Sequence, residues 1–174
     1  MSSLKTMTKD KKALSGGSEL CFLLENIRSA SNIGSIFRTA DAFGIKRIYL
    51  CGICAVPPNK EILKTALGAT VNVPWEYHED ASLVVNQLRV AGNSTILALE
   101  QSEGSSPLAS FTPELNSTLI VILGNELEGV SKPLLEKCDH VLEIPQYGLK
   151  KSLNVAVVAG IAAWELSNKI IRKK

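Results

Sequence analysis

The sequence LIVILGNELEG, residues 119–129, decides the fold of this chain. Its opening run, 119–123, is apolar at every position, which predicts a central β-strand that is covered on both faces. Gly124 and Asn125 follow directly, so we expect the strand to end there in a polar loop. Because such a strand needs cover on both sides of its sheet, the stretch predicts an α/β fold with helices on both faces.

Similar β-type runs alternate with helical patterns along the rest of the chain. The runs that predict strands are 20–24, 47–51, 71–75, 95–99, 119–123 and 141–144. Alternation of this kind predicts a mostly parallel sheet. The chain has 174 residues and 45% hydrophobic content, which is enough for one sizeable core. We therefore expect one domain, over residues 19–168.

The two ends of the chain are basic, although the formal net charge is only +2. Residues 1–12 hold four lysines and one aspartate, a net +3, and residues 169–174 carry +4, so residues 13–168 carry −5. We expect a flexible arm over 1–18 and a tail over 169–174. Both segments could reach the phosphates of a nucleic acid, or serve only to keep the protein soluble.

One helix is well marked between residues 31 and 44. Ser31 or Asn32 is its candidate N-cap, apolar residues recur with helical spacing, and Gly44 follows its end. Arg38 falls nearly opposite the middle of the apolar stripe. Since the core does not explain this arginine, it is either an ordinary surface residue or a functional one.

Three strand ends share an unusual chemistry. The buried strand runs into 124–129, another strand ends at 144–148, and the run 97–100 leads into a loop rich in serine and glycine. Ligands of open α/β sheets bind beyond the carboxyl ends of the strands, where these segments lie. Glycine lets a ligand approach the backbone, and irregular loops present free N–H and C=O groups. The three segments therefore predict a site for a nucleotide-like cofactor.

The last helix begins near residues 152–154 and is apolar around its whole circumference over 155–164. It is either a central core helix or a helix that a second subunit partly covers, and the small size of the domain favours the second, a homodimer. Ser152 and Asn154 would also fit ordinary N-cap positions of this helix.

The four cysteines are too few and too scattered for a disulfide-stabilised secreted fold, and no apolar run reaches the about 20 residues of a membrane span. We expect a cytoplasmic protein that does not associate with membranes. The pair Cys51 and Cys54 matches C-x-x-C, which occurs in redox and zinc sites, but no second close pair accompanies it. We expect structural cysteines at a strand end, and no bound metal.

Three blocks of sequence follow one another in a specific order. They are NIGSIFRTADAFG at 32–44, ILGNELEGV at 122–130 and IPQYGLKKSLNVA at 144–156. Together they resemble the SpoU/TrmH family of RNA ribose 2′-O-methyltransferases, within the SPOUT superfamily, over about residues 19–168. The resemblance implies an α/β fold with a C-terminal trefoil knot, and a homodimer whose active site lies near the subunit interface. It also implies S-adenosylmethionine as cofactor and tRNA or rRNA as substrate.

The resemblance further implies roles for individual residues. Those expected to be catalytic are Asn32, Arg38, Glu126, Ser152 and Asn154. Those expected to hold S-adenosylmethionine are Leu99, Gly124, Ile144 and Leu153.

The reaction places clear demands on such a site. The positive charge of the donor sulfonium disappears as its methyl group moves to oxygen, which suits a desolvated pocket. The ribose hydroxyl must lose a proton, and neither histidine lies in the three blocks. In the family the arginine that matches Arg38 is proposed as the base. Since a guanidinium has a pKa above about 12, a phosphate clamp that also stabilises the developing alkoxide is easier to defend. Glu126 would orient Arg38 or a polar neighbour, and Ser152 and Asn154 would hydrogen-bond the ribose or the cofactor.

The third block holds the remaining candidates. Lys150 and Lys151 are either phosphate-binding residues or simply exposed loop lysines. Gln146 stands where many relatives have methionine, which we interpret as a change in the pocket wall or in an RNA contact.

Two other functions are alternatives to the methyltransferase. A non-catalytic RNA-binding or assembly protein could keep the same fold without turnover. A Rossmann-type dehydrogenase is disfavoured because no G-x-G-x-x-G follows the first strand.

Overall fold

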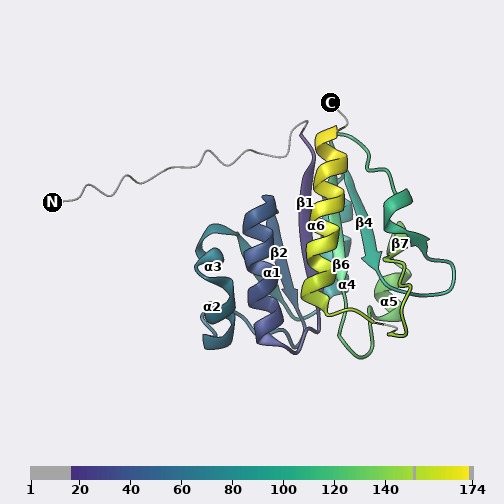
Figure 1. Ribbon diagram of the computed structural model, residues 1–174. Coiled ribbons are helices and arrows are strands. Elements are labelled where there is room, and N and C mark those ends of the chain that lie inside the picture. Colours follow the sequence, from purple (N-terminus) through teal and green to yellow (C-terminus); the bar gives the residue numbers. More distant parts are fainter. Residues whose placement is uncertain (1–16, 151, 173–174) are drawn as a thin grey trace.

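A parallel β-sheet forms the centre of the protein (Figure 1). The computed structural model describes residues 17–150 and 152–172. Neighbouring strands of the described sheet are all parallel, in the order β3-β2-β1-β6-β4-β7-β5. The strands are β1 (Glu19–Glu25), β2 (Arg47–Cys51), β3 (Trp75–His78), β4 (Ser94–Leu99), β5 (Ser106–Pro107), β6 (Thr118–Leu123) and β7 (His140–Glu143). The predicted α/β class with a mostly parallel sheet is confirmed.

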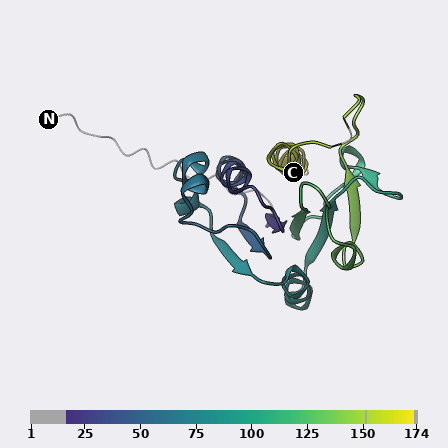
Figure 2. The same cartoon turned by 90° about the horizontal axis from the view of Figure 1, so that it is seen from below.

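Helices cover both faces of the sheet, as Figure 2 shows from one end. The helices are α1 (Ala30–Phe43), α2 (Lys60–Ala66), α3 (Ala69–Asn72), α4 (Ala81–Ala91), α5 (Lys132–Leu135) and α6 (Val155–Arg172), with a 3₁₀ turn at Leu108–Ser110. α1, α2, α3 and α6 share one hydrophobic core, and α4 and α5 share the other. Along β6, Leu119, Val121 and Leu123 point to the first core, whereas Ile120 and Ile122 point to the second. The prediction from 119–123 of a strand buried on both faces is therefore confirmed.

The prediction of a strand at 71–75 is wrong. Residues through Asn72 form the short helix α3, in which Val71 is 89% exposed, and the strand begins only at Trp75. The apolar run misled because Val73 and Trp75 contact the core from a helix end and from an edge strand, not from one continuous strand.

The N-cap of α1 also differs from the expectation. It is Ser29, whose Oγ accepts a hydrogen bond from the backbone N–H of Asn32 at 3.2 Å, and not Ser31 or Asn32. The predicted end is confirmed, because Gly44 has the left-handed conformation of a helix C-cap, with φ 67°.

The last helix extends into the segment that the sequence predicts as a basic tail. α6 continues through residues 169–172. The Lys169 ammonium donates to three backbone carbonyls of the 3₁₀ turn region, at 2.7 to 3.0 Å, and pairs with Glu165 at 3.0 Å. Residues 1–16, 173 and 174, which hold the rest of the predicted basic ends, lie outside the described residues.

α6 is buried along one side only. It packs on α1 and β6, while Val157 and Trp164 on its outer side are 49% and 59% exposed. In the part of the chain that the structure describes, no helix combines the length and apolar character that crossing a bilayer requires.

Candidate functional site

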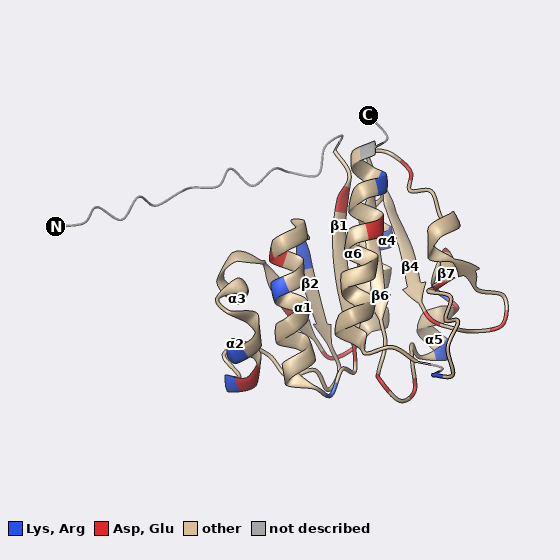
Figure 3. Cartoon of the chain, viewed as in Figure 1, with Lys and Arg blue, Asp and Glu red and all other residues tan. Residues whose placement is uncertain are grey.

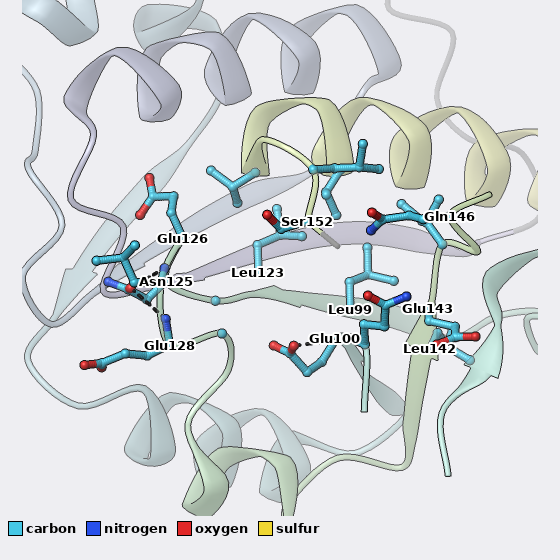
Figure 4. A pocket seen from close by; sticks show the side chains of 18 residues that line it. Leu99, Glu100, Leu123, Asn125, Glu126, Glu128, Leu142, Glu143, Gln146 and Ser152 are labelled. Carbon is cyan, nitrogen blue, oxygen red and sulfur yellow. Dashed lines mark hydrogen bonds between the residues drawn. The ribbon is translucent and has the colours of Figure 1, made fainter. Parts of the chain in front are cut away.

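A cavity of about 300 Å³ lies at the carboxyl ends of β4, β6 and β7 (Figure 4), and we call it the strand-end cavity. The loop after β6, residues 124–129, forms part of its lining. The rest of the lining comes from the ends of β4 and β6, from residues 142–144, 146, 152 and 153, and from the first turn of α6. Its aliphatic lining residues include Leu99, Leu123, Leu142, Val155 and Val158.

All four residues expected to hold the cofactor line the strand-end cavity. Leu99 ends β4, Gly124 follows β6, Ile144 follows β7 and Leu153 precedes α6. They converge because neighbouring parallel strands end at one edge of the sheet. Gln146 lines the same cavity, in keeping with its interpretation as a residue of the pocket wall.

The loop after β6 is held in shape by its own backbone. Asn125 and Gly129 exchange both backbone hydrogen bonds, at 3.0 and 2.9 Å. The Asn125 side-chain oxygen accepts from two further N–H groups of the loop, at 2.8 and 3.1 Å. A Cβ on Gly124 would lie 2.3 Å from the carbonyl carbon of Gly129, so only glycine lets the returning backbone pass this closely. This part of the cavity wall is therefore preformed.

Three of the residues expected to be catalytic form a hydrogen-bonded chain. Asn154 Nδ2 donates to Asn32 Oδ1 at 3.1 Å, and Asn32 Nδ2 donates to Glu126 Oε1 at 3.1 Å. Glu126 Oε2 also accepts from the backbone N–H of Arg28 at 3.5 Å. This hydrogen-bonded chain joins the starts of α6 and α1 to the loop after β6. The three sequence blocks thus meet at one place, beside the cavity that Glu126 lines.

Asn154 has a structural role as well. Its side-chain oxygen accepts from the backbone N–H of Ala156 at 2.8 Å and so caps α6. The cap uses the oxygen of the amide, whereas the contact with Asn32 uses the nitrogen. One side chain therefore caps α6 and contacts Asn32 at the same time.

The remaining candidate residues do not all lie at the cavity. Ser152 lines the cavity, but Arg38 does not. Arg38 is exposed on α1, about 9 Å further along the helix axis than Asn32. It has no side-chain hydrogen bond or ion pair with any residue that the structure describes. Lys150 is exposed, and Lys151 lies outside the described residues.

The charged residues that line the cavity are all acidic in the described part of the chain. They are Glu100, Glu126, Glu128 and Glu143. Carboxylates attract a sulfonium or an ammonium group and repel a diphosphate, and the aliphatic residues could contact an adenine. The lining therefore fits S-adenosylmethionine and does not fit NAD.

The Cys51 and Cys54 pair does not form a reactive site. Both thiols are buried, and Cys54 Sγ accepts from the backbone N–H of Ile27 at 3.2 Å. Burial raises the pKa of Cys51 to about 12 and also raises the pKa of Cys54. Neutral, buried thiols are poor nucleophiles and poor metal ligands. Within residues 17–150 and 152–172, no group of three or more His, Cys, Asp or Glu could hold a metal ion.

Sequence reasoning missed two glutamates that shape the cavity wall. Glu100 Oε2 accepts from the backbone N–H of Val130 at 2.8 Å, and Glu25 Oε2 accepts from that of Ser131 at 2.9 Å. A signal was available, because each glutamate comes at the carboxyl end of an apolar strand.

The sequence of the chain matches a known protein family. The model of the SpoU rRNA Methylase family matches residues 19–164 of the chain. A protein of Archaeoglobus fulgidus described as an uncharacterized tRNA/rRNA methyltransferase is 33% identical over 157 residues, which cover 90% of this chain and 67% of that relative.

Solved structures of methyltransferases are also similar to this chain. A TrmH/SpoU tRNA modifying enzyme of A. aeolicus has a TM-score of 0.79 at 26% identity, covering 89% of this chain and 77% of that one. The SpoU methyltransferase AviRb from Streptomyces viridochromogenes, solved in complex with the cofactor AdoMet, has a TM-score of 0.79 at 25% identity. That match covers 88% of this chain and 58% of AviRb, so AviRb extends well beyond the matched region. Together with the family match over residues 19–164, these similarities show that this chain belongs to the SpoU/TrmH family of SPOUT methyltransferases.

Proposed function

We propose that the chain transfers a methyl group from S-adenosylmethionine to a ribose 2′-hydroxyl of tRNA or rRNA. One observation carries the proposal: the strand-end cavity, lined by every residue expected to hold the cofactor, lies beside the hydrogen-bonded chain of Asn154, Asn32 and Glu126. Glu126 belongs to both the cavity lining and the hydrogen-bonded chain, so the two features adjoin at the carboxyl ends of the strands.

The protein residues in this reaction bind and orient the reactants. S-adenosylmethionine supplies an electrophilic methyl group on a sulfonium. The carboxylates of Glu128 and Glu143 favour a cation in the cavity, and the aliphatic residues exclude water from it. Asn32 fixes the Glu126 carboxylate, while Ser152 and Asn154 lie where polar groups of the ribose or cofactor can be bound. These roles explain why polar side chains gather at the edge of an otherwise apolar cavity.

Arg38 is the residue that we assign to the developing charge. Its exposed guanidinium, free of partners among the described residues, is available to hold an RNA phosphate and to stabilise the oxyanion of the attacking hydroxyl. A guanidinium with a pKa above about 12 acts more easily as this clamp than as the base. Lys150 and Lys151 are proposed as further phosphate-binding residues.

A homodimer is part of the proposal. Val157 and Trp164 form an exposed apolar stripe on α6, and the Trp164 ring packs edge-on against Phe43 of α1, with centroids 6.3 Å apart. A second copy would remove this stripe from water. Light scattering at micromolar concentration should give the mass of a dimer, and a monomer would contradict this part of the proposal.

The trefoil knot also remains a proposal. After β7, the last strand along the chain, residues 144–154 lead back to α6, which packs on α1 and β6 from earlier in the chain. This return path is what a C-terminal knot requires. We further propose a cytoplasmic location, which four free cysteines, three of them buried, support.

A non-catalytic RNA-binding protein is the second candidate, and one experiment separates the two. Methyl-labelled S-adenosylmethionine is incubated with the protein and with total RNA from cells that lack it, and the RNA is hydrolysed with alkali. Ribose 2′-O-methylation predicts label in alkali-resistant dinucleotides. Binding of RNA and cofactor without any label would favour the non-catalytic candidate.

A further inference from the structure

One buried and one half-buried carboxylate at this end of the sheet have no direct role in the methyl transfer proposed above. Glu25 ends β1 and is only 7% exposed, and Glu100 directly follows β4. β1 and β4 are the two neighbours of β6 in the sheet. The two glutamates therefore flank the loop that follows β6, one from each side.

Both carboxylates accept hydrogen bonds from the same short piece of backbone. Glu100 Oε2 accepts from the N–H of Val130 at 2.8 Å, and Glu100 Oε1 accepts from its neighbour Gln101 at 3.2 Å. Glu25 Oε2 accepts from the N–H of Ser131 at 2.9 Å, and Glu25 Oε1 accepts from the Ser131 hydroxyl at 2.6 Å. Consecutive N–H groups are thus held by carboxylates from opposite sides.

We propose that Glu25 and Glu100 are positioning residues of the cofactor site, which fix the loop 124–131 by holding the N–H groups of Val130 and Ser131. The inference rests on the proposed function, because the loop matters only if the cavity binds the cofactor. A buried carboxylate is costly unless hydrogen-bonded, so each glutamate is stable only with the loop in this place. The glutamates therefore hold the loop, and the loop in turn holds the two carboxylates in place.

Glycine is the only residue type that fits this arrangement at position 129. Its φ is +73°, and a Cβ there would lie 2.2 Å from Glu100 Oε2. The second glycine of G-N-E-L-E-G therefore leaves room for the Glu100 carboxylate, in addition to permitting the turn. Figure 4 shows Glu100 on the opposite side of the cavity from Glu126, with its carboxylate directed towards the returning loop.

The arrangement has a specific consequence for binding. The backbone around Asn125 holds the tip of the loop, and the two glutamates hold its end. Without them, Gly124 and Glu126 are no longer fixed relative to β4. Cofactor affinity should fall while the chemical step, which depends on Arg38, changes little.

The first test compares Glu100→Ala with Glu100→Gln and with Glu103→Ala. Glu103 is an exposed glutamate of the loop after β4 and serves as the matched control. We expect Glu100→Ala to weaken S-adenosylmethionine binding about tenfold in calorimetry and to raise KM more than it lowers kcat. Amide exchange at Val130 should become faster. Glu100→Gln keeps an acceptor oxygen and should recover most of the affinity, and Glu103→Ala should match the wild type.

The outcomes separate this inference from the proposed function. Wild-type affinity and unchanged Val130 exchange in Glu100→Ala would overturn the inference, whereas a wild-type protein that binds no S-adenosylmethionine would overturn the function. If Glu100→Ala does not fold, Ser131→Ala gives the second test, since it removes only the hydroxyl bond to Glu25. Faster exchange at Ser131 with weaker cofactor binding supports the inference, and no change in either contradicts it.

Discussion

The protein has a cavity at the carboxyl ends of its strands and a hollow at their amino ends, and the larger of these two is not the proposed active site. The strand-end cavity has a volume of about 300 Å³, whereas a hollow at the amino ends of β4 and β7 has about 570 Å³. Some of the polar side chains that line the amino-end hollow already form hydrogen bonds that serve the fold. Asp139 holds the N–H of Ile96 at 2.8 Å and pairs with Arg89 at 2.7 Å, and Ser110 bonds to a carbonyl of its own turn.

The difference shows that volume alone does not identify a ligand site. The strand-end cavity combines an aliphatic lining with carboxylates and with a loop that is fixed before any ligand arrives. The lining of the amino-end hollow is mostly polar and contains the ring pair of Phe111 and His140. Figure 3 shows acidic residues in the loops at the end of the sheet where β6 and β4 point.

Arg38→Ala should have the largest effect on turnover. Loss of the proposed clamp should lower kcat more than about 100-fold. S-adenosylmethionine affinity should stay within about twofold of wild type, because Arg38 does not line the cavity. Initial rates and calorimetry check the two parts. Wild-type rates in this variant would refute the assignment of Arg38.

Gly124→Ala should damage the strand-end cavity directly. The added Cβ would lie 2.3 Å from backbone atoms of Gly129 and Val130, so the loop must move. We expect a loss of about 1–3 kcal/mol in the free energy of unfolding and a loss of cofactor binding. Gly148→Ala is the matched control, since a Cβ there meets nothing within 4 Å. Denaturant titration and calorimetry should leave this control unchanged, and equal behaviour of the two variants would count against a preformed wall.

Asn154→Ser should separate the cap of α6 from the hydrogen-bonded chain. A serine hydroxyl can still cap the helix but is too short to replace the amide donor to Asn32. We expect stability within about 0.5 kcal/mol of wild type and a rate about tenfold lower. If thermal unfolding and turnover are both unchanged, Asn154 is only a helix cap.

Lys150→Ala should have the smallest effect. An exposed lysine that contacts one phosphate contributes a sequence-independent term, so RNA affinity should fall a few-fold and the salt slope of binding by about one. Cofactor affinity should not change. Binding measured at several salt concentrations with an unaltered slope would leave Lys150 without a role in RNA binding.

Periodicity and strand-end chemistry were sufficient to predict the class of the fold and to single out three segments that line one cavity. The run 119–123 predicted the central strand, and the three polar segments after strands predicted where a cofactor would bind. Long-range packing was not predictable in the same way. Val71 lies in a short exposed helix, and the glutamates at positions 25 and 100 find their N–H partners far along the chain. Such pairings depend on strand order, which the sequence pattern did not contain.

Backbone amide NMR during a titration with S-adenosylmethionine locates the cofactor site residue by residue. We predict chemical-shift changes at Leu99, Gly124 and Leu153, and none at Thr95 or Thr112 of the amino-end hollow. NAD at the same concentrations should leave all of these signals in place. Shifts confined to the amino-end hollow, or no shifts with S-adenosylmethionine at all, would contradict the assignment of the strand-end cavity as the cofactor site.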